Sequence, residues 1–185
     1  MVFISGPRQV GKTTLAKTIG DHLAPAIYFN WDNVVQRRRV LALDIPRDAK
    51  LLIFDENHKY RPWKRHLKGI FDSNEARQKI LVTGSARLDV YRRGGDSLMG
   101  RYHPYRLHPF SVAEALGENP ESKARPGQDI SIADASPAGR EAFETLLRFG
   151  GFPEPFCLTA LAKFGQRKYG AEKQRSRAAC AGRAG

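Results

Sequence analysis

Short runs of apolar residues recur along the chain, separated by segments with apolar residues at helical spacing. The runs at 51–54 and 80–83 are almost uniformly apolar and do not alternate with polar residues. Such uniformity is typical of strands in a parallel sheet whose two faces are both covered by helices. Between these runs, Trp63, Leu67 and Ile70 have the spacing of one helix face. We therefore predict an α/β fold, a three-layer sandwich with a mainly parallel five-stranded sheet.

The boundaries of the elements follow from the apolar runs and from residues that start or stop helices. The predicted strands cover residues 2–4, 26–30, 51–54, 80–83 and 105–107. The first helix is expected to end near Gly20, and later helices cover residues 33–43, 62–71 and 139–148. Ser111 and Glu114 have the spacing of a capping box, in which each side chain accepts a backbone amide at the start of a helix. A short helix is therefore predicted after Ser111.

A strand, a glycine-rich segment and a helix follow one another at the start of the chain. The segment reads Gly6-Pro7-Arg8-Gln9-Val10-Gly11-Lys12-Thr13, the spacing of a phosphate-binding P-loop. Its glycines let backbone N–H groups point at phosphate oxygens, and the positive end of the helix adds to the attraction. Lys12 then reaches the β and γ phosphates, and the Thr13 hydroxyl ligates Mg²⁺. The residues predicted to bind ATP are Gly6, Pro7, Arg8, Gln9, Val10, Gly11, Lys12, Thr13 and Thr14.

Two carboxylates end the third predicted strand. Asp55 follows four apolar residues, and ligands of a doubly wound sheet bind at the carboxyl ends of its strands. We expect Asp55 to hold Mg²⁺ opposite Thr13 and the adjacent Glu56 to orient and polarise the attacking water.

Three further residues are candidates for contact with the γ-phosphate. Ser85 closes the fourth strand and is interpreted either as a ligand of the phosphate or water or as a turn residue after Gly84. Arg101 follows a glycine-flanked loop, where an arginine finger would reach the γ-phosphate of its own or a neighbouring subunit. Arg87 is the alternative candidate for the arginine finger.

His58 lacks metal-ligand spacing and is interpreted as a surface or packing residue.

The composition limits the class of protein and shows which part of the chain carries its positive charge. The chain has 185 residues, 41% of them hydrophobic, enough for one domain with a sizeable core. No apolar run approaches the roughly 18 residues of a membrane span, and the first residues already form a strand, so a cytoplasmic protein without a leader is expected. The cysteines at 157 and 180 are interpreted as free thiols. Half of the net charge of +12 comes from residues 157–185, and nucleic acid stays open as a partner.

Polar and apolar composition also divides the chain. A core is predicted over residues 1–116, and a polar linker or insertion rich in Ser, Asp, Glu and Pro over 117–138. A helix and a Gly-Gly-Phe-Pro-Glu-Pro segment, over 139–156, close the domain. Residues 157–185 mix Ala, Lys, Arg and Gly without periodicity, which predicts a basic, disordered tail.

Four blocks of sequence together resemble the ATPase domain of a prokaryotic AAA-type family whose full-length members append a C-terminal domain of unknown function. The blocks read GPRQVGKTTLA, LLIFDENHKYRPWKRHLKGIFD, ILVTGSARLDVYRRGGDSLMGRYHPYRLHPFSVAE and GGFPEPF. The resemblance implies ATP binding and hydrolysis with Mg²⁺, with Lys12, Thr13, Asp55 and Glu56 on matching motif positions. It implies a sensor role for Ser85 and an arginine-finger-like role for Arg101.

The chain departs from this family pattern at three places. Asn57 stands beside Glu56 where members usually have an apolar residue. The family's segment before the first strand is missing, and the chain beyond Phe156 resembles nothing in the family, so a fragment is expected.

The motifs leave several functions open. The leading hypothesis is a P-loop ATPase domain that is not bound to a membrane, and self-association stays open. The alternatives are a fragment that binds ATP without turnover, a small-molecule P-loop kinase with Arg92 and Arg93 in a lid, and a basic nucleic-acid module.

Overall fold

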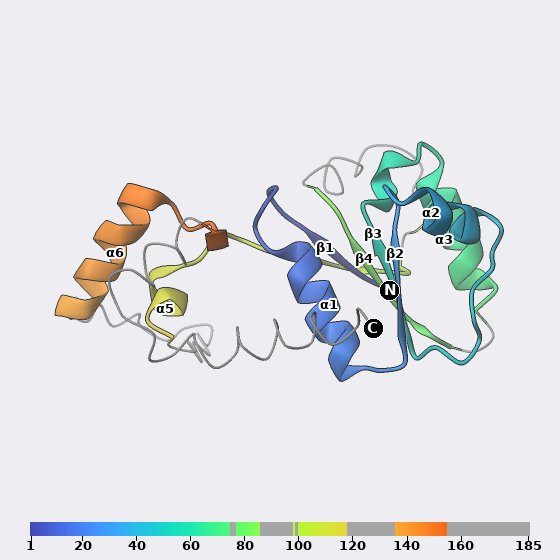
Figure 1. Cartoon of the computed structure of the whole chain (residues 1–185), viewed down its shortest axis with the longest axis horizontal. Coiled ribbons are helices and arrows are strands. Elements are labelled where there is room, and N and C mark those ends of the chain that lie inside the picture. Colours follow the sequence, from blue (N-terminus) through green and yellow to red (C-terminus); the bar gives the residue numbers. More distant parts are fainter. Residues whose placement is uncertain (75–76, 86–97, 99, 118–135, 155–185) are drawn as a thin grey trace, which may run out of the picture. The chain divides into compact units, whose positions relative to one another are not determined.

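The computed structural model describes residues 1–74, 77–85, 98, 100–117 and 136–154. The chain divides into two compact units, Met1–His108 and Pro109–Gly185 (Figure 1). Arg87, Arg92 and Arg93, most of the predicted linker and the predicted tail with both cysteines lie outside the described residues. The division of the chain at residue 116 stays a prediction.

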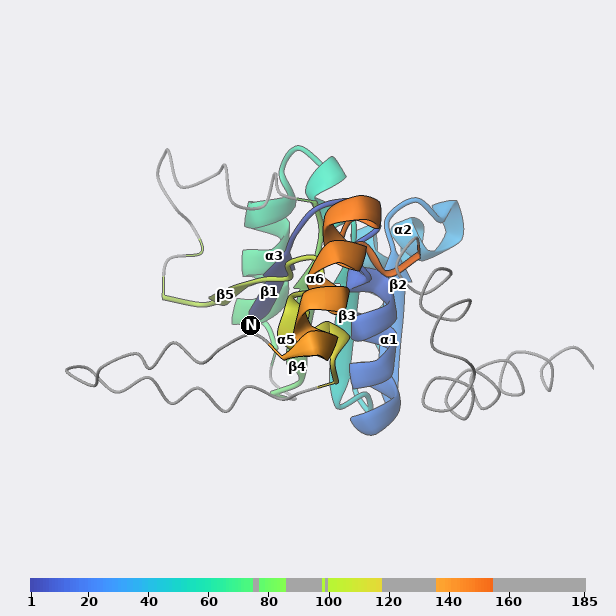
Figure 2. The ribbon, with the colours of Figure 1, turned by 90° about the vertical axis from the view of Figure 1, so that its left-hand side faces the viewer.

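The first unit is built on a five-stranded sheet in which every neighbouring pair of strands is parallel. Its strands are β1 (Val2–Ser5), β2 (Ala26–Asn30), β3 (Leu51–Asp55), β4 (Lys79–Thr83) and β5 (His103–Arg106). They lie in the order β2-β3-β4-β1-β5, with β5 at one edge beside β1 (Figure 2). The predicted five-stranded sheet is confirmed, and β4 lies between the strand before the P-loop and the strand that ends in Asp55.

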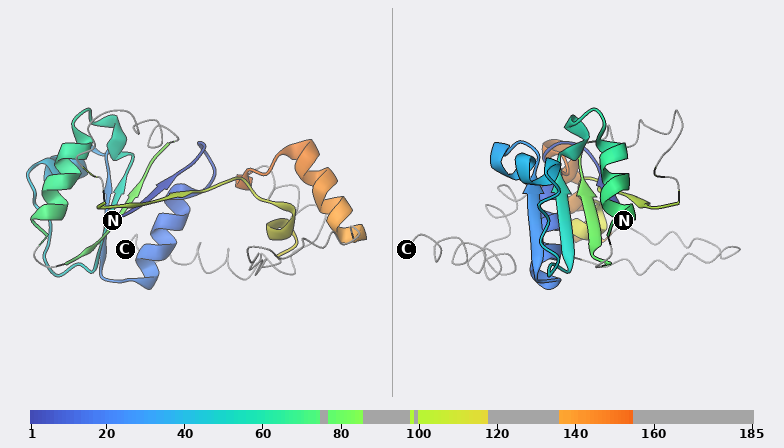
Figure 3. Two further views of the ribbon diagram at one scale, coloured as in Figure 1. Left: turned by 180° about the vertical axis from the view of Figure 1, so that it is seen from behind. Right: turned by 90° about the vertical axis from the view of Figure 1, so that its right-hand side faces the viewer.

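Helices cover both faces of this sheet, as the uniformly apolar strands predicted. They are α1 (Lys12–His22), α2 (Val34–Leu41), the 3₁₀ helix η1 (Asn57–Lys59) and α3 (Trp63–Asp72). Figure 3 shows α1 on one face and α3 on the other. Successive residues of β3 alternate between these two layers: Leu51 and Ile53 pack with α1, whereas Leu52 and Phe54 pack with α2 and α3. The three-layer sandwich is confirmed.

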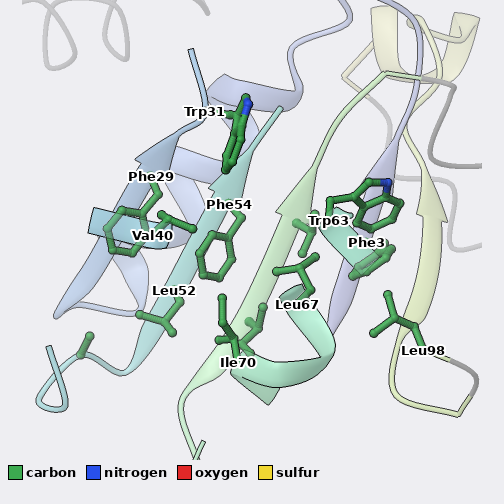
Figure 4. Packing of buried hydrophobic residues seen from close by; sticks show 13 residues of the cluster. Phe3, Phe29, Trp31, Val40, Leu52, Phe54, Trp63, Leu67, Ile70 and Leu98 are labelled. Carbon is green, nitrogen blue, oxygen red and sulfur yellow. The ribbon is translucent and has the colours of Figure 1, made fainter. Parts of the chain in front are cut away.

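The larger of the two cores lies under α2 and α3 (Figure 4). Phe54, Leu52, Leu67 and Val82 are almost completely buried there. Burying one such side chain contributes about 1.5–3 kcal/mol. The Phe54 ring stacks on Phe29 with ring centroids 5.5 Å apart. This core fixes β3 and α3 on either side of the turn that follows Asp55.

Several helix ends differ from the expected ones by one or a few residues, and two of these differences have a local physical reason. α1 continues past Gly20, because the glycine serves close packing and does not stop the helix: a Cβ there would lie 3.0 Å from the Ile53 side chain. α2 begins at Val34 because Asn33 caps it, with Oδ1 accepting the amides of Val35 and Gln36 at 3.0 and 3.1 Å.

The second unit contains α5 (Val112–Ala115) and α6 (Pro137–Phe149). The predicted capping box is confirmed, with the Ser111 amide donating to Glu114 Oε2 at 2.8 Å. Gly150 ends α6, and the Phe110 amide donates to the Gly151 carbonyl at 2.7 Å. A Cβ on Gly151 would lie 2.7 Å from the Phe110 carbonyl oxygen, so the double glycine lets the chain return close to the start of α5. None of the described helices is long and apolar enough to cross a membrane.

Candidate functional site

The loop between β1 and α1 needs glycine at two positions, for two different reasons. A Cβ on Gly6 would lie 2.4 Å from the Leu107 carbonyl oxygen, so this position has no room for a side chain. Gly11 has φ 96° at the start of α1, a left-handed conformation that favours glycine. Gln9 also has positive φ, at 63°. Arg8 and Gln9 are exposed, whereas Val10 is buried under the loop. The loop therefore has the tight turn that the P-loop spacing predicted.

Lys12 is the first residue of α1 and folds back over the loop. Its side chain is buried, with a relative exposure of 7%, and Nζ donates to the carbonyls of Gly6, at 3.0 Å, and Pro7. Burial lowers the pKa of the Lys12 ammonium, an effect that the Glu56 and Asp55 carboxylates oppose. The Lys12 ammonium thus lies among backbone carbonyls at the start of the helix. The neighbouring Thr14, also predicted to bind ATP, is exposed in the first turn of α1.

Asp55 is buried at the end of β3, with a relative exposure of 3%, and three hydroxyl groups donate to it. Oδ2 accepts from Thr13 Oγ1 at 2.8 Å and from the Tyr28 hydroxyl at 2.6 Å. Oδ1 accepts from Thr83 Oγ1 at 2.5 Å. A buried carboxylate is costly unless its oxygens are hydrogen-bonded, and these three donors meet that requirement. The structure therefore brings Thr13 and Asp55 together, and their joint binding of Mg²⁺ stays a prediction.

Tyr28 and Thr83 were not predicted as site residues. Both lie on strands beside β3, and Thr83 is directly opposite Asp55 in the parallel register. The sequence signal at Thr83 is a hydroxyl-bearing residue at the end of an otherwise apolar strand, which marks the residue but does not show that it lies opposite Asp55. Burial raises the pKa of the Tyr28 phenol and its hydrogen bond to Asp55 raises it further, so Tyr28 stays a proton donor to that carboxylate.

Glu56 lies one residue past β3 in a left-handed conformation, with φ 59°. Its amide donates to the Thr83 carbonyl at 3.0 Å, and its Oε2 lies 3.4 Å from Lys59 Nζ. Lys59 Nζ also donates to Asp32 Oδ2 at 2.6 Å. That hydrogen bond is the main cause that raises the pKa of the Lys59 ammonium. The Glu56 carboxylate is thus held beside a cation shared with Asp32, at the end of β3.

His58 joins Glu56 to the end of β4. His58 Nε2 lies 3.9 Å from Glu56 Oε2 and 3.0 Å from Ser85 Oγ, with the imidazole largely buried between them. The buried imidazole agrees with the interpretation of His58 as a packing residue, and it also lies beside Glu56 in the candidate site, which the sequence did not indicate. The structure brings Ser85 to Glu56 through this imidazole.

Arg101 is not brought to the P-loop. It precedes β5, so it lies at the amino edge of the parallel sheet, whereas Asp55 lies at the carboxyl edge. Its Nε donates to Asp72 Oδ1, the last residue of α3, at 2.9 Å. A contact of Arg101 with a nucleotide of a neighbouring subunit stays a prediction.

Thr13 and Asp55 offer Mg²⁺ one hydroxyl and one carboxylate. Among the described residues, no group of three or more His, Cys, Asp or Glu side chains could hold a metal ion by itself. Mg²⁺ commonly binds to one or two carboxylates together with substrate phosphates and waters, so this sparse oxygen set fits a cation that arrives with a nucleotide.

Asn57 is buried beside Glu56, with a relative exposure of 1%, and neither amide atom has a hydrogen-bond partner within the part of the chain that the structure describes. Leucine has the same branched heavy-atom shape without polar atoms. Because an unsatisfied buried polar group costs about 1–3 kcal/mol, Asn57→Leu should raise the free energy of unfolding by that amount. In a thermal melt, each kcal/mol corresponds to roughly 2–4 °C in Tm.

The same substitution at Asn33 is the matched control, because Asn33 caps α2. Asn33→Leu should lower stability by about 0.5–2 kcal/mol. A Tm of Asn57→Leu at or below that of the unaltered chain would mean that the Asn57 amide is satisfied, and would contradict the prediction.

Comparison with known proteins places the first 116 residues among AAA proteins. A family model described as an AAA domain matches residues 1–116. Uncharacterized proteins of Mycobacterium bovis and Mycobacterium tuberculosis are each 29% identical over 116 residues, which cover 62% of this chain and 26% of theirs. The chain thus spans about a quarter of the length of these curated relatives. Among solved structures, Caenorhabditis elegans PCH-2 is similar with a TM-score of 0.48 and 13% identity, over 88% of this chain and 55% of that one.

Proposed function

The chain belongs to the AAA domain family, and we propose that its first unit binds ATP with Mg²⁺ at the loop between β1 and α1 and hydrolyses it to ADP and phosphate. The observation that carries the proposal is the contact of Thr13 with Asp55, 2.8 Å between Oγ1 and Oδ2, beside the buried ammonium of Lys12. One hydroxyl, one carboxylate and one ammonium are the groups that a magnesium-bound triphosphate requires.

Each group has a separate task in binding. Lys12 exchanges its hydrogen bonds to loop carbonyls for bonds to the β and γ phosphates, which are stronger because both partners are charged. Thr13 and Asp55 would hold Mg²⁺, and the ion would supply neutralisation of charge on the phosphate oxygens. Tyr28 and Thr83 keep the Asp55 carboxylate in position through their hydrogen bonds.

Glu56 is the group that makes this site hydrolytic. Its carboxylate follows Asp55 directly and orients the attacking water, accepting a proton from it. Lys59 at 3.4 Å and His58 at 3.9 Å limit the directions that this carboxylate can take. His58 in turn lies within hydrogen-bond distance of Ser85, so Ser85 reaches the water or the γ-phosphate from the end of β4.

Calorimetric titration of ATP and Mg²⁺ into the chain, together with an assay of phosphate release, tests the proposal. The expected result is binding with phosphate release that needs no added acceptor. Binding without release would identify a chain that only binds ATP, and ADP formation that depends on an added acceptor would identify a kinase. Either outcome overturns hydrolysis, and the absence of binding overturns the nucleotide site as well.

Removal of Mg²⁺ is expected to abolish phosphate release, and loss of the Thr13 hydroxyl is expected to shift the dependence of release to higher Mg²⁺ concentrations. EDTA should bring phosphate release to background, because the ion supplies several kcal/mol of charge stabilisation in the transition state. Thr13→Val removes one of the ion's oxygen ligands and should raise the Mg²⁺ concentration for half-maximal release by about tenfold.

Thr18→Val is the matched control for Thr13→Val. Thr18 lies exposed on the same helix, where its hydroxyl donates to the Thr14 carbonyl at 3.0 Å. Its Mg²⁺ dependence should equal that of the unaltered chain. Equal Mg²⁺ dependence of both variants would contradict the role given to Thr13.

A further inference from the structure

A strongly basic pocket lies at the amino edge of the sheet, where the chain enters β3 and β4. Its volume is about 350 Å³. Because all strands are parallel, this edge is opposite the one that carries Asp55 and the loop before α1. A ligand in this pocket would therefore not compete with ATP. The charged side chains that line it are Arg47, Asp48, Lys50, Arg77 and Lys79.

Among the described residues that line the pocket, the four cationic side chains (Arg47, Lys50, Arg77 and Lys79) stand against one carboxylate, that of Asp48. Within the residues that the structure describes, none of the four lies within 4 Å of a carboxylate oxygen. Like charges around one hollow repel one another, and an anion in it removes that repulsion. The whole first unit, residues 1–108, has twenty Lys and Arg against ten Asp and Glu, a net charge of +10. The pocket thus lies in a unit whose overall field attracts polyanions.

The backbone around the pocket is cross-linked by one side chain. Gln78 Nε2 donates to the carbonyls of Pro46 and Ala49 at 2.8 and 2.9 Å, which joins the segment before β3 to the segment before β4. Asn74 Oδ1 accepts the Gln78 amide at 3.0 Å, and the Lys79 amide donates to the Lys50 carbonyl at 2.9 Å. The cationic residues are therefore carried on a hydrogen-bonded frame.

A second pocket adjoins the basic one and shares Arg47 and Gln78 with it. Its volume is about 540 Å³, and its other lining residues are partly aliphatic and partly polar: Leu43, Ile45, Leu52, Ile70, Ser73 and Asn74. Leu43 is 57% exposed there, although exposure of a leucine side chain to water is unfavourable. A ligand that fills both pockets has an anionic part and an adjacent part with apolar faces and polar edges. A nucleotide unit has this composition, with a phosphate next to a base.

We propose that the two adjoining pockets bind single-stranded nucleic acid, with phosphates beside Arg47, Lys50, Arg77 and Lys79 and an unpaired base in the second pocket. A base is free to enter a pocket only when it is not paired, which selects single strands over duplexes. Because the phosphates repeat along the strand, binding extends beyond one nucleotide and depends on salt, with little dependence on base sequence. The site makes nucleic acid a partner of the first unit in addition to ATP.

Fluorescence anisotropy of a labelled oligothymidylate of about 20 nucleotides, measured with the full chain, tests the proposal. Arg47→Glu/Lys50→Glu should weaken binding by about tenfold or more and reduce the slope of log K against log salt by about 0.7 for each lost contact. Arg38→Glu/Arg65→Glu is the control, since it changes the net charge equally at exposed positions on α2 and α3. Both variants should keep the thermal stability and ATP affinity of the unaltered chain.

The outcomes separate this proposal from general charge attraction and from a protein partner. Equal weakening in the two double variants, or no binding by the unaltered chain, overturns it. So does pocket-dependent binding of poly-glutamate of equal charge without pocket-dependent binding of the oligonucleotide. An abasic strand should bind more weakly than oligothymidylate, and Leu43→Ser should reduce that difference. If the abasic strand and a duplex of the same length both bind as tightly as oligothymidylate, the assignment of a base to the second pocket is overturned.

Discussion

Lys12→Ala is expected to lower the affinity for ATP by about 100-fold or more, so that calorimetric titration detects little or no binding. Hydrogen bonds to charged groups contribute about 1.5–3 kcal/mol each, and 1.4 kcal/mol is a factor of ten in affinity. Lys12 is already buried and turned toward the loop, with its pKa lowered by that burial, so phosphate oxygens would gain an ammonium that has little competing water. The loss of this one side chain should therefore abolish the nucleotide site.

The fold of the variant is controlled separately. Removing a buried ammonium should leave the Tm unchanged or raise it, because the burial that lowers the Lys12 pKa disfavours the charged group. Lys68 lies in α3, on the face of the sheet opposite α1, so Lys68→Ala should bind ATP as the unaltered chain does. Affinity of Lys12→Ala within about threefold of the unaltered chain would contradict the assignment of the loop as the phosphate site.

Glu56→Gln should retain ATP binding and reduce phosphate release by about 10²- to 10⁴-fold, the usual contribution of a general base. The amide keeps the shape of the carboxylate and its place beside Lys59, but it accepts no proton from water. Calorimetry and phosphate release measured on the same sample separate the two effects. A variant that binds ATP but does not turn it over would assign Glu56 to the chemical step.

Glu144→Gln serves as the matched change at an exposed position on α6 and should leave turnover unaltered. Equal phosphate release by Glu56→Gln and the unaltered chain would remove Glu56 from the mechanism. His58 and Ser85 would then be the next groups to test, because they are 3.0 Å apart at the same strand ends.

Features encoded in short stretches of sequence were predictable. The loop before α1 has its own spacing of Gly and Lys, and the strands are uniformly apolar because helices cover both faces of the sheet. Asp55 was found for the same reason, as the first charged residue after a buried strand. These predictions need only neighbouring residues, and the structure has the elements where they were expected.

Features that depend on the arrangement of strands were not predictable from local patterns. The order of the strands brings Thr83 opposite Asp55, and no spacing in the sequence reports that order. Tyr28 required the register of β2 against β3. Arg101 was placed near the γ-phosphate from its loop alone, whereas the direction of β5 puts it at the other edge of the sheet. The positions of these three residues relative to the candidate site are all set by pairing between strands that are distant in the sequence.

The contact between Gly6 and Leu107 has a mechanical consequence. With a hypothetical Cβ only 2.4 Å from the Leu107 carbonyl, and the Leu107 amide donating to Ser5 at 2.8 Å, the two backbones have no slack between them. Leu107 is one residue from the end of the first unit. Any movement of Gly6 toward Leu107 would therefore displace the segment by which the chain leaves this unit. One glycine thus ties the loop before α1 to the exit of the chain.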